Sequence, residues 1–68
     1  MDTITRSRRF DVNGEPIMVC YIGDPTTAKR VYYYLDDTTT GPIIDADTDR
    51  AIGQMNGTLA PIRAALTA

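Results

Sequence analysis

Three alternating aspartates are the densest group of potential metal ligands in the chain. They are Asp45, Asp47 and Asp49. A calcium loop uses this spacing because alternate carboxylates converge on one ion, but it also needs glycine at its sixth position and glutamate at its twelfth. Arg50 and Asn56 occupy those positions. We therefore expect no metal site and no cofactor, and we interpret the aspartates as the acidic start of a helix, with cation binding as the alternative.

Cys20 is the single cysteine and the first candidate for a reactive group. A reactive thiol needs an electropositive, partly open setting and usually a base. The chain has no histidine, and Cys20 lies within the apolar run 17–22, so we interpret it as a small buried hydrophobic residue. Gly53 and Gly57 match no phosphate-binding loop. The sequence therefore predicts that the protein is not an enzyme.

Arg6, Arg8 and Arg9 form the basic cluster of the sequence. A guanidinium group binds carboxylate or phosphate through two parallel hydrogen bonds, so the cluster is a candidate contact for an acidic protein surface or for nucleic acid. Side chains alternate across a strand, which places Arg6 and Arg8 on one face and Arg9 on the other. The alternative is that these are solvated charges that protect an edge strand from aggregation.

Three consecutive tyrosines form the second candidate contact. If their segment is a strand, Tyr33 packs inward, and Tyr32 and Tyr34 lie on the opposite face with Arg30. Exposed tyrosine and arginine are enriched in protein interfaces, and aromatic rings can also stack on bases. A helix covering that face would instead bury all three tyrosines. With the acidic loop that follows, the predicted partner-binding residues are Arg6, Arg8, Arg9, Arg30, Tyr32, Tyr34, Asp36 and Asp37.

The best-defined local element is a hairpin around Asn13-Gly14. Both residues tolerate positive φ, as a two-residue type I′ turn requires. Strands over 6–12 and 15–22 then pair so that Val12 faces Glu15. We expect one face of this hairpin to be the core side, namely Phe10, Val12, Ile17, Val19 and Tyr21. The second strand is apolar on its other face as well, which predicts a central strand covered on both sides.

The segment 25–36 admits two structures. Its run of Val31 and three tyrosines favours a strand. The alternative is a helix capped by Asp24, with Pro25 at its first position. After a loop over 36–42, Ile43-Ile44 is interpreted as a short returning strand.

The C-terminal third predicts a helix. Apolar residues at 52, 55, 59, 62 and 66 recur at helical spacing, and Asp45, Asp47 or Thr48 can cap its start. Gly57 and Pro61 interrupt the pattern, and an interior proline costs about 3 kcal/mol. We therefore expect a break near Gly57, with Thr58 capping a second short helix that has Pro61 in its first turn.

These elements predict one small α+β domain over residues 1–68. It is an antiparallel meander of three or four strands with the broken C-terminal helix packed on one face. The expected core is Met18, Val19, Tyr21, Ile22, Val31, Tyr33, Leu35, Ile52, Met55, Leu59, Ile62 and Leu66. One helix cannot cover both faces of a sheet, so we expect an uncovered apolar face for a partner or a second copy.

Composition narrows the class of protein. A chain of 68 residues with one cysteine cannot form an internal disulfide, and domains below about 70–80 residues usually need a further stabiliser, which favours a homodimer or a bound partner. The net charge of −2 argues against a dedicated nucleic-acid binder. The absence of a long apolar run and of a secretory signal predicts a cytoplasmic protein without membrane contact.

The function expected from these features is that of a small non-enzymatic binding module that modulates or inhibits a larger protein. Proteins of this size are often encoded by phages or other mobile elements, which is a suggestion from size alone. One alternative is a nucleic-acid-binding regulator that uses the arginines and tyrosines. Another is a homo-oligomeric structural subunit that associates through the apolar stripe over 52–66.

Overall fold

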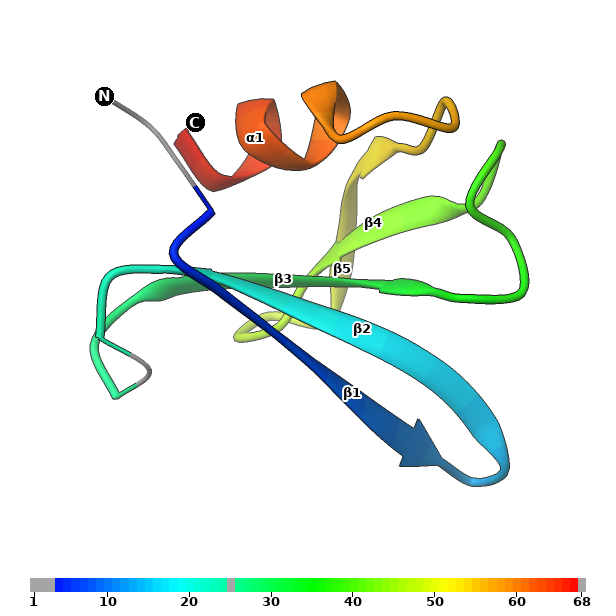
Figure 1. Ribbon diagram of the computed structural model, residues 1–68, viewed down its shortest axis with the longest axis horizontal. Helices are drawn as coiled ribbons and strands as arrows, with labels where there is room; N and C mark the ends of the chain where they lie inside the picture. Colours follow the sequence, from blue (N-terminus) through cyan, green and yellow to red (C-terminus); the bar gives the residue numbers. More distant parts are fainter. Residues whose placement is uncertain (1–3, 25, 68) are drawn as a thin grey trace.

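A computed structural model describes residues 4–24 and 26–67 as a five-stranded antiparallel sheet with one helix (Figure 1). The strands follow one another across the sheet in chain order, β1 to β5. This confirms the small α+β meander but corrects the strand count, which the sequence underestimated by missing one strand of the C-terminal third. The elements are β1 Arg6–Val12, β2 Glu15–Ile22, β3 Lys29–Tyr34, β4 Pro42–Asp45, β5 Arg50–Gln54 and α1 Ala60–Thr67.

The first hairpin has the predicted turn and register. Asn13 and Gly14 have φ of 53° and 83°, as a type I′ turn requires. Val12 pairs with Glu15, and the alternation continues along the whole of β1. Local turn chemistry therefore determines which residues of β1 and β2 share a face.

The tyrosine segment is strand β3, paired antiparallel with β2. The alternative helix is wrong, and its expected first residue, Pro25, lies outside the described residues. Asp24 does cap a turn, because its Oδ1 accepts hydrogen bonds from the amide and the hydroxyl of Thr26. The turn ends at β3, where β-branched and aromatic side chains favour pairing with β2.

The aspartate segment is a hairpin turn rather than a helix start, which is the main correction. Asp45 Oδ1 accepts hydrogen bonds from the amides of Asp47 and Thr48, and Asp49 has a φ of 60°. The same side-chain chemistry caps helices and closes tight turns. Here it reverses the chain so that β5 pairs with β4, with a register shift between Ile43 and Ile44.

Of the predicted broken helix only the short second part is confirmed, because the part before Gly57 is strand β5. Thr58 Oγ1 accepts a hydrogen bond of 3.3 Å from the amide of Ala60, the first residue of α1. Pro61 follows in the first turn, where the missing amide proton is tolerated. The helix places Ile62, Ala65 and Leu66 against the sheet.

The core lies between α1 and one face of the sheet. Ile43 and Ile62 are fully buried at its centre, and Cys20, Val31, Tyr33, Met55, Ala65 and Leu66 surround them. Met18, Ile22 and Leu35 are partly buried against this cluster. The sequence therefore identified most of the core, including the burial of Cys20, but missed Ile43 and Ala65.

Three expectations about the core are wrong. Ile52 and Leu59, which the helical stripe placed inside, are 42% and 48% exposed, because 52 belongs to β5 and 59 precedes α1. The helix also covers the face of β2 that holds Cys20, not the face with Phe10. The covered face is apolar through its centre, whereas arginines interrupt the other.

We predict that Ile62→Ala lowers the free energy of unfolding by about 2–5 kcal/mol, because it leaves a cavity at a fully buried position. Ile62→Val should cost about 0.5–1.5 kcal/mol and keeps the measurement possible if the alanine variant does not fold. The matched control is Leu59→Ala, which should change stability by only about 0.5 kcal/mol. Denaturant titrations compare them, and equal losses at the two positions would contradict this helix orientation.

Candidate partner-binding face

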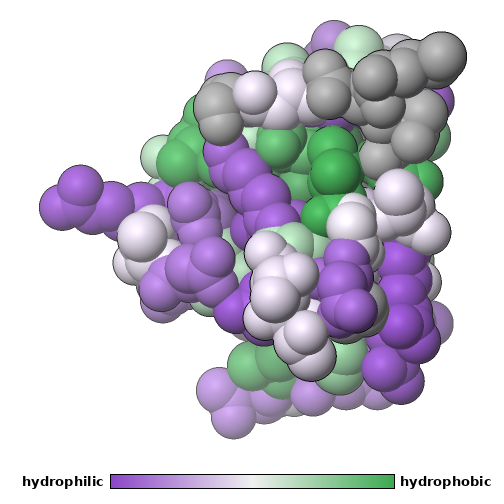
Figure 2. Space-filling view, turned by 90° about the vertical axis from the view of Figure 1, so that its left-hand side faces the viewer, coloured by the Kyte–Doolittle hydropathy of each residue, from purple (hydrophilic) through white to green (hydrophobic). Residues whose placement is uncertain are grey.

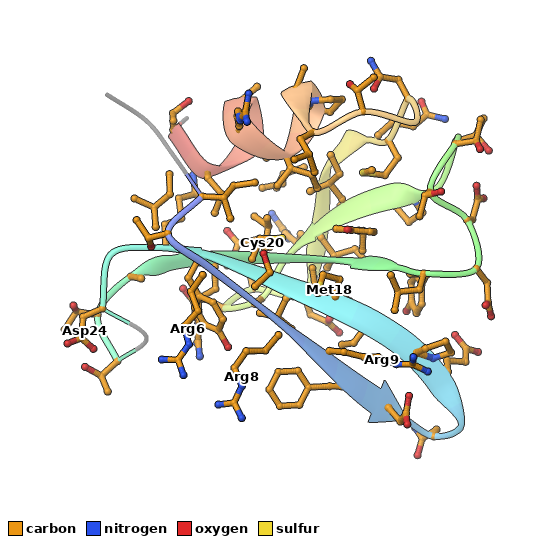
Figure 3. The ribbon with its side chains drawn as sticks, in the orientation of Figure 1. Arg6, Arg8, Arg9, Met18, Cys20 and Asp24 are labelled. Atoms are coloured by element: carbon orange, nitrogen blue, oxygen red, sulfur yellow. The ribbon has the colours of Figure 1, made fainter. Side chains whose placement is uncertain are left out.

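The face of the sheet opposite α1 is covered by no described helix or strand. We call it the open face. Figure 3 shows Arg6 and Arg8 extending on this side of β1, while Cys20 lies on the side of α1. By strand alternation and register, the open face includes Arg6, Arg8, Phe10, Val12, Glu15, Ile17, Val19, Tyr21, Arg30, Tyr32, Tyr34, Ile44 and Ala51.

The floor of the open face is shielded by its own side chains. Ile17 and Tyr21 are each only 7% exposed, and Ile44 is also buried, although no helix packs on this side. Long arginine and tyrosine side chains from neighbouring strands can lie over apolar residues while their polar ends reach water. The exposed layer is thus formed by arginine and aromatic side chains above an apolar floor.

The cationic end of the open face is formed by Arg6 and Arg8 on β1. Neither arginine forms an ion pair within the described part of the chain. The Arg8 guanidinium lies over the Phe10 ring, 5.7 Å from its centroid. Arg9, the third member of the predicted cluster, lies on the other face, where it forms an exposed pair with Asp11 at 3.7 Å. The alternation predicted for the three arginines is therefore observed.

The opposite end of the open face is fixed by two contacts with the β4–β5 turn. Arg30 forms an ion pair with Asp47, and the Tyr32 hydroxyl donates a hydrogen bond to Asp49 Oδ1. That hydrogen bond raises the pKa of Tyr32 to about 12, with burial as a second cause. The Tyr34 ring meets the Tyr32 ring edge to face, with centroids 6.1 Å apart. Two of the predicted contact residues are thus held by acidic neighbours.

A hollow of about 330 Å³ opens on this face at the hairpin end. Apolar and aromatic side chains form most of its wall, with one carboxylate at the rim. It is lined by Val12, Asn13, Glu15, Ile17, Tyr32 and Tyr34. Phe10 and Val12, which the sequence placed in the core, are 41% and 49% exposed beside it. Their apolar character without a covering helix was the signal for a surface site.

Figure 2 views the molecule from the β2–β3 turn. Hydrophobic atoms gather in its upper half, the half that holds α1 in Figure 1, and a smaller hydrophobic group lies near the lower edge. Hydrophilic atoms separate the two groups. The surface therefore has apolar area outside the core layer.

The predicted acidic contacts lie in a loop outside the strands of the open face and do not join the other aspartates. Asp36 and Asp37 begin the β3–β4 loop, at the opposite end of β4 from the β4–β5 turn. Asp37 accepts hydrogen bonds from the amide and the hydroxyl of Thr40, and the bond from the amide is the main cause that lowers the pKa of Asp37. Asp37 therefore stabilises its own loop, and only Asp36 is free of such a role.

The alternating aspartates direct their carboxylates to three different partners. Asp45 accepts a hydrogen bond from the amide of Asp47 and so closes the turn. Asp47 forms an ion pair with Arg30, and Asp49 accepts a hydrogen bond from the Tyr32 hydroxyl. The described residues hold no group of three or more acidic, cysteine or histidine side chains placed to bind one metal ion.

Comparisons of the chain with known protein families, with curated proteins and with solved structures give no match. Within residues 4–24 and 26–67, no helix has the length and apolar character needed to cross a membrane. A function for the open face must therefore be argued from its own chemistry.

We predict that Tyr32 ionises about two pH units later than an ordinary tyrosine, near pH 12 instead of 10.0. The hydrogen bond that raises this pKa adds to the free energy of unfolding below pH 10. This contribution is lost as the pH rises from 10 toward 12, because Tyr32 loses its hydroxyl proton at a lower pH in the unfolded chain than in the folded one. Asp49→Ala should lower the pKa, as followed by tyrosinate absorbance. An unchanged titration in this variant would show that the hydrogen bond to Asp49 does not raise the pKa of Tyr32.

We also predict that the Cys20 thiol is unreactive in the folded protein. Cys20 is 2% exposed, and burial raises its pKa, while the Ser7 hydroxyl donates a 3.8 Å hydrogen bond to Sγ. A thiol reagent should react only as fast as the chain opens, and at the rate of a free thiol once denaturant is added. Rapid reaction without denaturant would place Cys20 at the surface.

Proposed function

We propose that this protein is a non-enzymatic binding module whose open face attaches to a larger protein and alters the activity of that protein. The observation that carries the proposal is the exposed layer of arginine and aromatic side chains on a sheet face without a covering element. Residues of these types dominate binding energy at protein interfaces because each offers a large apolar contact with a polar end.

The charges on the open face favour a particular kind of partner surface. Arg6 and Arg8 lie on the same face of β1 with one residue between them, and neither guanidinium group forms an ion pair within the described residues. Carboxylates on the partner are the complementary groups. Next to them, Phe10, Val12 and the hollow offer apolar area. The partner surface that fits is a small apolar protrusion with acidic residues along one side.

A protein partner fits this face better than nucleic acid does. Arg30 already pairs with Asp47, and Asp49 accepts a hydrogen bond from the Tyr32 hydroxyl, so carboxylates line one border of the face. These carboxylates repel a phosphate backbone, and the net charge of −2 gives no long-range attraction to it. Binding would block the surface that the module covers, which is a sufficient mechanism for inhibition.

The test compares matched variants in capture from a lysate. Arg6→Glu and Tyr34→Ser change the open face, and each should reduce retention of a bound protein at least about tenfold. Arg63→Glu repeats the charge reversal and Leu59→Ser replaces an apolar side chain, both at exposed positions on the helix side, and neither should change retention. Circular dichroism of all four variants confirms that they are folded.

Two outcomes would reject the proposal. One is a protein bound equally by both pairs of variants, which would place the contact elsewhere. The other is material lost on nuclease treatment with affinity that falls steeply with salt, which would identify nucleic acid as the ligand.

A further inference from the structure

The two edges of the sheet differ in their capacity to pair with another strand. The β5 edge has five residues, contains Gly53 and follows a register shift in its partner strand. Such irregularities bend and twist a strand and protect it from pairing. The β1 edge has seven residues in unbroken register, without glycine or proline, and all seven are exposed. The backbone of β1 is therefore open to another strand, and its charged side chains restrict which strand can pair there.

The hydrogen-bonding pattern of the hairpin determines which β1 backbone groups are unpaired. The type I′ turn makes Val12 and Glu15 a hydrogen-bonded pair, and such pairs alternate along an antiparallel ladder. The amide and carbonyl groups of Ser7, Arg9 and Asp11 therefore point away from β2. Within the described residues no strand pairs with this edge, and α1 packs against the other strands.

A second copy of β1 can pair with this edge in only a few registers. In an antiparallel pair related by a two-fold axis, residues 7, 9 and 11 of one copy must face odd-numbered residues of the other, because only their backbone groups point away from β2. Registers that place Arg9 opposite Arg9, Asp11 opposite Asp11 or Arg8 opposite Arg8 bring like charges together, which is destabilising. One register places Arg9 opposite Asp11 twice.

We propose that the protein forms a homodimer in which the β1 edges of two copies pair antiparallel, with Arg9 of each copy opposite Asp11 of the other. The sheet then continues from one copy into the next. This proposal is independent of the proposed function, because it concerns the purified chain alone.

The same register also accounts for the exposed apolar side chains of β1. Phe10 lies on the two-fold axis and faces Phe10 of the second copy in a non-hydrogen-bonded pair, where cross-strand side chains approach most closely. Phe10 is 41% exposed in the single chain. Arg8 of the second copy faces Val12, and Glu15 is the next residue across the sheet. Each copy thus gains an aromatic contact and a cation beside the carboxylate of the hollow.

The ion pair within one chain does not compete strongly with this arrangement. Arg9 and Asp11 are 3.7 Å apart, with side chains 64% and 68% exposed, and exposed pairs of this kind contribute little. The apolar residues over 52–66 do not form one exposed stripe, because Met55, Ile62 and Leu66 are buried in the core of the chain.

Sedimentation equilibrium of the purified full chain, from micromolar to millimolar concentration, tests the proposal. Arg9→Asp and Asp11→Arg each turn two cross-strand pairs into like-charge pairs, so each should weaken dimerisation at least about tenfold. The double variant R9D/D11R restores opposite charges and should recover the wild-type dissociation constant. Arg63→Asp makes an equal charge change at an exposed position of α1; it is the control and should leave the dissociation constant of the dimer unchanged.

A second measurement locates the interface on the backbone. The amides of Arg9 and Asp11 should exchange more slowly with solvent deuterium as the protein concentration rises. A wild-type chain that stays monomeric at millimolar concentration overturns the proposal. Three other results would also overturn it. They are a dimer that the single charge reversals leave intact, a double variant that stays monomeric, and a dimer whose β1 amides exchange at the rate of the monomer.

Discussion

One short helix must stabilise a five-stranded sheet, and the rest of the structure follows from this constraint. The eight residues of α1 can pack against one face only. The fully buried residues Val31, Ile43 and Ile62 lie in that layer. The other face has to shield its apolar floor with its own side chains, and β1 lies beyond the reach of the helix. A thin core therefore creates both the open face and the open edge.

The β4–β5 turn connects this constraint to the chemistry of the open face. Its aspartates first close the turn through Asp45, and then fix Arg30 and Tyr32 through Asp47 and Asp49. One end of the face is thereby neutralised and held in place. The other end keeps unpaired guanidinium groups within the described chain. The two ends of the open face therefore differ in charge, and a partner surface with acidic groups at one end can bind it in one orientation only.

The proposed edge pairing and the proposed face contact meet along β1. Pairing occupies the outward backbone groups and brings Arg9 and Asp11 together on one face, while on the open face it adds contacts of Phe10, Arg8 and Val12 with the second copy and leaves Arg6 to a partner. Two paired copies would place their open faces side by side in one continuous sheet. A partner with two equivalent sites would then bind both at once, and the local concentration of the second site would strengthen attachment without any new contact.

The sequence alone determined the elements whose signals are local. Asn13 and Gly14 specify a hairpin and its register because few residues accept positive φ, and Thr58 with Pro61 marks the start of α1. The same alternation separated Arg6 and Arg8 from Arg9. Tertiary structure decided the rest. Asp45 can cap a helix or a turn with the same hydrogen bonds, and the choice depended on whether β4 was there to pair with β5. Which face of β2 is covered depended likewise on where α1 packs, because both faces of that strand are apolar and only contacts between distant residues distinguish them.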